Sequence, residues 1–371
     1  MPDGNERAHD GAWLGWDVGG AHVKAAWWRP DGGLSRIAAV MQVACPLWQG
    51  LTHLDAAVDA VFAAWPQARR AGQAVTMTGE LADGFEHREA GVQAIAQRMA
   101  ERTGSGERLR VFAGASGDGA AIWRPPSEAA SHWRAIASAN WLATAVAVRT
   151  RLPRGVDAVL LVDIGSTTTD LIPLRSEPGG LCTASDADRL ADGTLVYQGV
   201  VRTPLCALGA RVRWQGRVSN VMNEFFATTA DVYRLTGELD EAHDQHPSAD
   251  QGPKTLDGSR CRTARMIGRD ARDGDAADWL GLARQWRGRQ VDELAFQAQR
   301  VLDAAGLPQQ APLVAAGCGD FLVRDLAQRL QRRVLGVDEL WKVSAGVRSW
   351  VKVAAPAVAV ALLAAEPGGA V

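Results

Sequence analysis

Two short segments of the sequence place an aspartate at the end of an apolar run and then continue with glycine. The first, DVGGAHVK, begins at Asp17, and the second, DIGSTTTD, begins at Asp163. Glycine lets the chain turn sharply, and the N–H groups exposed in such a turn can bind phosphate oxygens. The neighbouring carboxylate can hold Mg²⁺, directly or through water. A single loop of this kind is a common hairpin turn, but two of them predict a phosphate clamp, whose binding residues would be Gly19, Gly20, Gly165, Ser166, Thr167 and Thr168.

Two further features fit the same chemistry. Only four of the 40 basic residues are lysines, and Lys24, directly after the first loop, is the only one before residue 254. An ammonium group is a compact charge for a phosphate and is not freely exchanged for a guanidinium group. A third glycine turn, with Gly317 and Gly319, follows an apolar run and precedes a predicted helix, where the backbone can approach an anionic ligand closely.

The elements that would carry these loops form a repeat. Strands are predicted over 12–18, 21–28 and 37–43, and the strand–turn–strand pattern with an early aspartate recurs over 157–174. Long helices are predicted over 129–149, 219–235 and 344–365. We therefore expect two α/β lobes, 11–154 and 155–371, with the last helix packing back towards the first lobe.

The composition argues against several classes of protein. A net charge of −2 argues against a nucleic-acid partner that is bound through a strongly basic surface. Five cysteines without a CxxC pair fit a reducing cytoplasm, and the polar N-terminal residues do not resemble a signal peptide. The apolar run 353–365 contains Pro356 and is too short to span a bilayer, so no membrane partner is expected. The sequence leaves open whether the chain forms a homo-oligomer.

The order and spacing of the three turns resemble those of the actin, sugar-kinase and heat-shock chaperone superfamily, and the two aspartate loops resemble its hydantoinase/oxoprolinase-related branch. Several longer stretches are similar to tetrahydromethanopterin-linked C1 transfer pathway proteins: TMTGELADGF (76–85), ASANWLAT (137–144), YQGVVRTPL (197–205), NEFFATTADVYRLTGEL (223–239) and ARMIGRDA (264–271). The resemblance runs from about residue 12 to residue 350. It implies a two-lobed actin-like ATPase fold with RNase H-like lobes and a central cleft between them.

A methanogen relative is similar to a furan-methanamine synthase of methanofuran biosynthesis. The resemblance therefore implies a transferase that joins an aminomethylfuran diphosphate to a tyramine- or tyrosine-derived phenol and releases diphosphate. Mg²⁺ at Asp17 and Asp163, together with Lys24, Thr167 and Thr168, would hold the diphosphate. Neutralising that charge makes it a better leaving group.

The ELADGF turn offers two candidate bases for the phenol, Glu80 and Asp83, although a solvated turn would contain the same residues. Asn140 interrupts an apolar helix and is either a structural hydrogen-bonding residue or a ligand contact. The remaining candidates for substrate binding could equally be surface or ordinary helical residues: Arg202, Glu224, Thr228 and Asp231.

Two other classes of function stay open. In an ATP-dependent kinase or a hydantoinase-type amidohydrolase, the same loops would hold ATP, but Gly317-Cys318-Gly319 is short for an adenosine site of this superfamily. A non-catalytic nucleotide-binding regulator is disfavoured because both strand-end aspartates are present.

Overall fold

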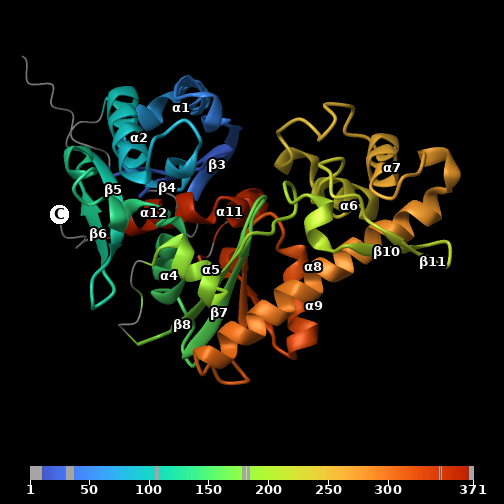
Figure 1. Ribbon diagram of the computed structural model, residues 1–371. Helices are drawn as coiled ribbons and strands as arrows, with labels where there is room; N and C mark the ends of the chain where they lie inside the picture. The colour runs from blue at the N-terminus through green and yellow to red at the C-terminus, as the bar shows by residue number, and fades with distance from the viewer. Residues whose placement is uncertain are drawn as a thin grey trace, which may run out of the picture. The chain divides into compact units, whose positions relative to one another are not determined.

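The computed structural model describes residues 11–30, 37–104, 108–177, 181, 184–341, 343 and 345–366 (Figure 1). The chain divides into two compact units. Unit 1 comprises Met1–Asp157, Leu174–Asp186 and Gly336–Val371, and unit 2 comprises Ala158–Pro173 and Ala187–Leu335. The first boundary lies close to the expected division at 154/155, whereas the last part of the chain groups with unit 1.

Unit 1 is built on a six-stranded sheet whose central strand ends in the first loop. The strand order is β3-β2-β1-β4-β5-β6; β1 pairs antiparallel with β2 and parallel with β4. The strands predicted over 12–18, 21–28 and 37–43 are therefore present. The bounds are β1 (Trp13–Val18), β2 (His22–Trp28), β3 (Ile37–Ala44), β4 (Gly72–Met77), β5 (Leu109–Ala115) and β6 (Ala121–Arg124).

The two faces of this sheet are covered by helices from different parts of the chain. On one face, Leu14, Trp16 and Val18 pack in a core with α1 (Thr52–Ala64) and α2 (Arg88–Thr103). The opposite face packs against α12 (Ala355–Ala364), which contacts β1, β2 and β4 (Figure 1). The approach is so close at Gly15 that an added Cβ would lie 2.0 Å from the carbonyl oxygen of Ala357. Only glycine fits at this point.

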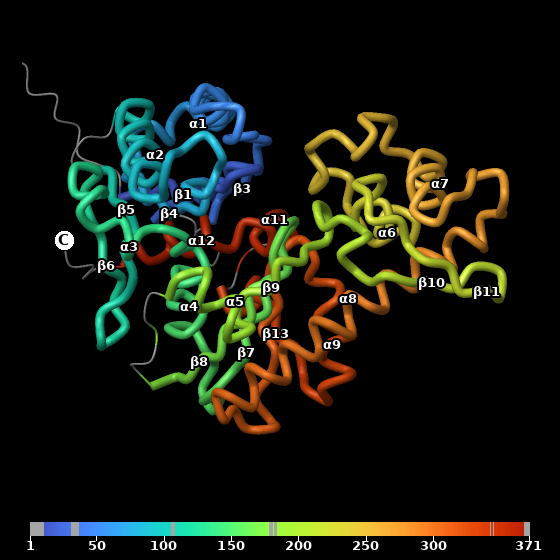
Figure 2. Tube along the Cα trace, viewed as in Figure 1, coloured from blue at the N-terminus to red at the C-terminus, as the bar shows by residue number. Residues whose placement is uncertain are grey.

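Unit 2 contains a five-stranded sheet of order β13-β12-β7-β8-β9 (Figure 2). As in unit 1, the strand that carries the aspartate lies between its hairpin partner and a parallel strand from later in the chain, here β12. This shared arrangement bears out the predicted internal repeat. The bounds are β7 (Ala158–Ile164), β8 (Thr169–Arg175), β9 (Leu195–Val196), β12 (Leu313–Ala316) and β13 (Val334–Gly336).

The rest of unit 2 is mainly helical. The long helix α8 (Ala276–Ala304) packs against α6 (Thr229–Thr236) and α9 (Phe321–Leu330), and α7 (Leu256–Arg265) packs against α6. A small two-stranded sheet, β10 (Arg211–Trp214) and β11 (Arg217–Asn220), lies against α8. A further short helix, α5 (Asp186–Asp192), begins at the last residue of the middle segment of unit 1.

Two predicted helices were wrong in their extent. The helix predicted over 129–149 is divided into α3 (Trp133–Ile136) and α4 (Asn140–Arg149), because Ser138 adopts a left-handed backbone with φ 51°. The helix predicted over 219–235 begins only at Thr229, after β11. Thr228 and Asp231 form a capping box there, which explains why these side chains favour a helix start over a helix interior.

The helix predicted over 344–365 is also divided, into α11 (Arg348–Val353) and α12; Ser344 itself lies outside the described residues. In the part of the chain that the structure describes, no single helix is long and apolar enough to cross a membrane. Ala345–Val353 and Ala355–Ala364 meet that criterion only when taken together, and the chain bends by 106° between them.

Candidate functional site

The first aspartate loop places a carboxylate and an ammonium group side by side. Asp17 is the penultimate residue of β1 and lies directly opposite Lys24 in β2; the Lys24 Nζ lies 3.5 Å from an Asp17 carboxylate oxygen. The Asp17 side chain is buried, whereas Lys24 is partly exposed. Gly19 closes the turn through a hydrogen bond from its N–H to the carbonyl of His22. The structure thus brings together the carboxylate, lysine and glycine residues predicted for the first half of the phosphate clamp.

A row of polar residues crosses the sheet at this level. Lys24 is opposite Gln42 in β3, and Asp17 is opposite Thr76 in β4, so the four side chains share one face. Thr76 is fully buried, and its hydroxyl makes no hydrogen bond with the described residues. Gln42 and Thr76 were not predicted from the sequence as site residues. The signal that could have found them is a polar residue within each mostly apolar strand.

The turn after β4 packs directly on the first loop. Thr78 donates its N–H to the carbonyl oxygen of Val18 at 3.0 Å. At Gly79 an added Cβ would lie 3.1 Å from that same oxygen and 3.3 Å from the carbonyl oxygen of Gly19. The next residue, Glu80, is 1% exposed, whereas Asp83 is exposed. The two candidate bases therefore occupy different environments, and only Glu80 is buried beside the loop.

Glu80 belongs to a buried network that the sequence analysis did not find. The Oγ of Ser138 lies 2.8 Å from Oε1 of Glu80 and 3.1 Å from Oδ2 of Asp186. Arg88 donates to the same oxygen of Asp186 at 2.7 Å. Burial raises the pKa of Glu80, and this outweighs the lowering effects of its hydrogen bonds and of Arg88. These partners are far apart in sequence, and Ser138 lay inside a predicted continuous helix.

The second aspartate loop is held by backbone contacts within unit 2. Gly165 donates its N–H to the carbonyl of Thr168 at 2.8 Å, and the carbonyl of Ser166 accepts the N–H of Arg202 at 2.9 Å. Gly199 approaches so closely that an added Cβ would lie 2.4 Å from the nitrogen of Thr167. Ser166, Thr167 and Thr168 are only partly buried, and the Arg202 side chain is exposed. The predicted phosphate-binding residues of this loop and Arg202 are therefore neighbours.

The third glycine turn packs against the second loop. Gly317 has φ 84°, and an added Cβ would lie 2.1 Å from the carbonyl oxygen of Ile164 and 2.6 Å from Oδ1 of Asp163. Gly319 donates its N–H to the same Ile164 carbonyl at 2.8 Å. Asp163 itself is partly exposed at the end of β7, opposite Ala316. A side chain at Gly317 would displace the backbone next to Asp163, whereas one at Gly319 would meet the side chains of Ile164 and Val200.

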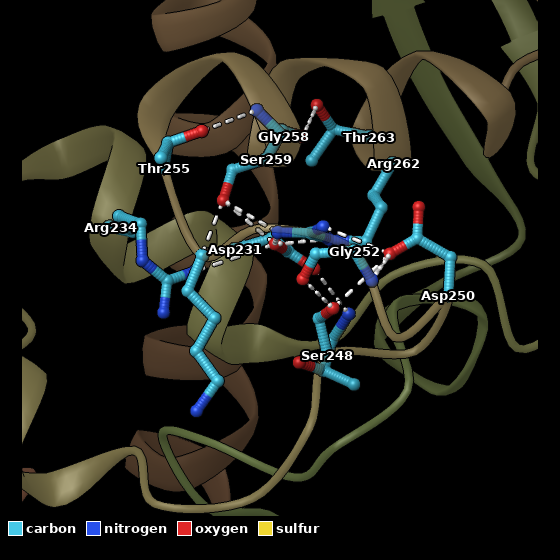
Figure 3. Close-up of polar contacts among 12 residues, drawn as sticks. Asp231, Arg234, Ser248, Asp250, Gly252, Thr255, Gly258, Ser259, Arg262 and Thr263 are labelled. Carbon is cyan, nitrogen blue, oxygen red and sulfur yellow. Dashed lines mark hydrogen bonds and ion pairs between the residues drawn. The ribbon is translucent and has the colours of Figure 1, made fainter.

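The structure assigns Asp231 to a buried ion-pair network (Figure 3). Its Oδ1 accepts hydrogen bonds from Ser259 and from Nε of Arg262, both at 2.8 Å, and its Oδ2 accepts the N–H of Thr228. Arg262 is fully buried and also pairs with Asp250 at 3.0 Å. Because its oxygens already accept hydrogen bonds from the protein, Asp231 has a structural role in this state.

The other candidates for substrate binding have different surroundings. Thr228 precedes α6, so it is not mid-helix, and Glu224 lies before the helix and is exposed. Glu224 and Asp231 therefore do not lie on one helix, although both fall within the helix predicted over 219–235. Asn140 is partly buried at the first residue of α4, where its Oδ1 accepts the N–H of Trp141 at 2.7 Å.

Metal binding by protein side chains alone has no support in the described parts of the chain, which contain no group of three or more His, Cys, Asp or Glu residues suited to a metal ion. Mg²⁺, however, is usually held by one or two carboxylates together with substrate phosphates. Asp17 and Asp163, each at the end of a strand beside a glycine turn, are carboxylates of the kind that this ion prefers.

Comparisons with known proteins identify the family of the chain and its relatives. Residues 71–335 match the family model described as hydantoinase/oxoprolinase. A curated protein of Methanocaldococcus jannaschii, (4-{4-[2-(gamma-L-glutamylamino)ethyl]phenoxymethyl}furan-2-yl)methanamine synthase, is 28% identical over 261 residues, which cover 68% of this chain and 71% of that protein. The protein of the same name from Methanococcus vannielii is 27% identical over 173 residues, covering 47% of this chain and 76% of that protein.

Among solved structures, nucleotide-free acetone carboxylase matches with a TM-score of 0.56 at 11% identity, over 94% of this chain and 70% of that one. Together with the repeated sheet order, this likeness gives the chain the mixed α/β fold of that protein, in agreement with the α/β fold class that the resemblance implied. Since the family model covers most of the chain, the protein belongs to the hydantoinase/oxoprolinase family.

Proposed function

We propose that this protein transfers an aminomethylfuran group from its diphosphate ester to the phenol oxygen of a tyramine- or tyrosine-derived acceptor and releases diphosphate. The names of the two curated relatives support this proposal, because their product contains a phenoxymethyl link between a phenol oxygen and a furan-bearing carbon. The observation in the structure that carries it is the buried Glu80, on a turn hydrogen-bonded to the loop of Asp17 and Lys24.

The reaction balances with the residues at hand. The phenol oxygen forms a bond to the furan methylene carbon while the bond from that carbon to the diphosphate oxygen breaks. The diphosphate leaves as an anion, and the phenol proton is accepted at the Glu80 carboxyl group. General acid–base catalysis by a positioned carboxyl group contributes about 10²–10⁴-fold.

The diphosphate would be bound by the two aspartate loops. Lys24 would supply a positive charge, the N–H groups of the glycine turns would bind phosphate oxygens, and Arg202 would add a guanidinium group beside the second loop. Mg²⁺ held by Asp17 and Asp163 would neutralise the diphosphate charge and thereby make it a better leaving group.

The test is product formation without ATP. The purified protein is incubated with aminomethylfuran diphosphate, glutamyl-tyramine and Mg²⁺, and both pyrophosphate and the ether product are measured. We expect both to appear in equal amounts. A strict requirement for ATP with formation of ADP would overturn the proposal in favour of a kinase or an amidohydrolase.

Paired variants sharpen this test. Glu80→Gln should lower kcat by about 10²-fold or more, because the amide cannot accept the phenol proton. Asp83→Asn is the matched control, since it changes an exposed carboxylate of the same turn, and it should leave kcat unchanged. If Asp17 and Asp163 act on one diphosphate, Asp17→Asn and Asp163→Asn should each abolish most turnover, and the double variant should lose little more.

A further inference from the structure

The hydroxyl of Ser138 lies within hydrogen-bond distance of two carboxyl groups but carries only one proton. It lies 2.8 Å from Oε1 of Glu80 and 3.1 Å from Oδ2 of Asp186. If both carboxyl groups were ionised, one of the two short contacts would join two acceptors. A second proton on one of the carboxyl groups satisfies both contacts.

The surroundings decide which carboxyl group holds that proton. Arg88 donates to Asp186 at 2.7 Å, so its positive charge lies directly beside the Asp186 carboxyl group. Among the described residues no cation pairs directly with Glu80, and its buried Oε2 makes no hydrogen bond with them. The charged groups that act on Glu80 are Arg88 from α2 and Asp186 from α5, whereas Asp83, Glu86 and His87 of its own segment are exposed.

We propose that Ser138 is a positioning residue that connects a protonated Glu80 to an ionised Asp186. Glu80 donates its proton to the Ser138 oxygen, and Ser138 donates its own proton to Asp186, whose charge is balanced by Arg88. Glu80 is 1% exposed and needs a route by which protons reach water, whereas the Asp186 side chain is 15% exposed. The network supplies that route.

The catalytic consequence rests on the proposed function. The Oε2 of Glu80 takes the phenol proton while Oε1 passes its proton to Ser138, and the Ser138 proton passes to Asp186. The net result is one proton moved from the acceptor phenol to Asp186, and Glu80 remains protonated throughout. This relay explains how a buried and protonated carboxyl can still serve as the base.

The backbone of Ser138 adopts an unfavourable conformation that places its hydroxyl group between the two carboxyl groups. A left-handed conformation is unfavourable for a non-glycine residue, and Ser138 adopts φ 51° between α3 and α4. On the far side of Glu80, α2 packs at Gly91, where an added Cβ would lie 2.7 Å from the Glu80 carbonyl oxygen. Glu80 and Ser138 are thus fixed from two sides.

The test measures the protonation of Glu80 in the full-length protein without any substrate. The carboxyl carbons of glutamate are labelled with ¹³C, and the Glu80 signal is assigned through Glu80→Gln and followed by NMR as the pH changes. We expect it to stay in the acid form well above pH ~4.3, where a glutamate in a model peptide ionises. A Glu80 signal that titrates near that pH would overturn the proposal.

Two variants should move the proton affinity of Glu80 in opposite directions. Asp186→Asn removes a negative neighbour and should lower that affinity about tenfold, whereas Arg88→Gln removes a positive neighbour and should raise it. Glu86→Gln is the matched control and should leave the Glu80 signal unchanged. Equal signals in the Asp186→Asn variant and the wild type would contradict the link.

The role of Ser138 is isolated by a double-variant cycle. Ser138→Gly removes the hydroxyl and tolerates the left-handed backbone, so it is better matched than Ser138→Ala. In the Ser138→Gly background the effect of Asp186→Asn should shrink to less than half, because the hydrogen-bonded link is gone. An undiminished effect would reduce Ser138 to a structural residue. None of these measurements needs turnover, so failure of the proposed transfer reaction would be seen separately, as an absence of pyrophosphate release.

Discussion

The side chains of Ser138 and Glu80 are 2.8 Å apart although 58 residues separate them in the sequence. Their contact joins the turn after β4 to the break between α3 and α4, two places where regular structure stops. It sets a buried carboxyl group beside the first aspartate loop.

The raised pKa of Glu80 makes the stability of the protein depend on pH. In the folded state Glu80 keeps its proton above pH ~4.3, where an unfolded glutamate releases it. Its contribution to the free energy of unfolding is therefore fully present below the unfolded pKa and is lost as the pH rises through the folded pKa. Glu80→Gln imitates the neutral carboxyl, so the wild type should lose stability relative to this variant as the pH rises. Urea unfolding at a series of pH values measures this difference, and a constant difference would contradict the raised pKa.

Gly91 should be required for the position of Glu80. In Gly91→Ala the new methyl group would meet the Glu80 backbone, and overpacking of this kind costs about 1–3 kcal/mol. Gly281→Ala in α8 is the control, because nothing lies within 4 Å of its added Cβ; it should stabilise the protein by about 0.5–1 kcal/mol. Thermal unfolding compares the two. Equal effects of the two substitutions would argue against close packing of α2 on the turn.

Arg262 should matter for stability and not for substrate affinity. Arg262→Met would leave Asp231 buried without its main charged partner, which costs about 3–5 kcal/mol. Arg260→Met, which breaks the exposed pair with Asp257 on the same helix, should cost less than about 1 kcal/mol. Denaturant unfolding tests the difference, and KM for both substrates should be unchanged in the folded Arg262→Met protein. A raised KM in this variant would indicate that Asp231 contributes to substrate binding.

Gly317 should be required by the second loop for two reasons: it has no side chain where the loop packs closely, and it adopts a positive φ. Gly317→Ala would place a methyl group against the Ile164 carbonyl and Asp163, and we expect at least a tenfold loss of diphosphate affinity. Gly216→Ala is the matched control: Gly216 has nearly the same positive φ, 81°, but nothing lies within 4 Å of its added Cβ. Competition by pyrophosphate in the transfer assay measures the affinity. If both variants bound pyrophosphate equally well, close packing at Gly317 would have no role in binding.

The parts of the site that could be predicted from the sequence are those whose signal is local. Asp17 with Gly19, and Asp163 with Gly165, are each written within three consecutive residues, and the apolar run before each pair marks its strand. Gly317 was also found, because a glycine between a strand and a helix needs a special backbone.

The parts that were missed depend on contacts between distant segments. Ser138 lies in an alanine-rich stretch whose composition favours a helix, and only tertiary packing imposes the left-handed turn there. Asp186 is more than 100 residues from Glu80 in the sequence and reaches it through Ser138, and no local sequence pattern predicts this contact. For Asp231 the sequence left two interpretations open, a substrate contact or an ordinary helical residue, and the hydrogen bonds that cap α6 and join Asp231 to Arg262 come from contacts that no local pattern predicts.

The packing of α12 on β1 has a consequence for folding during synthesis on the ribosome. Gly15 is among the first residues of the sheet to be synthesised, and the helix that covers it contains Ala357 and Ala361 from near the end of the chain. The face of the unit 1 sheet that α12 covers therefore remains exposed to solvent while all of unit 2 is being translated. Chains truncated before α12 should therefore bind chaperones and should aggregate when they are expressed alone.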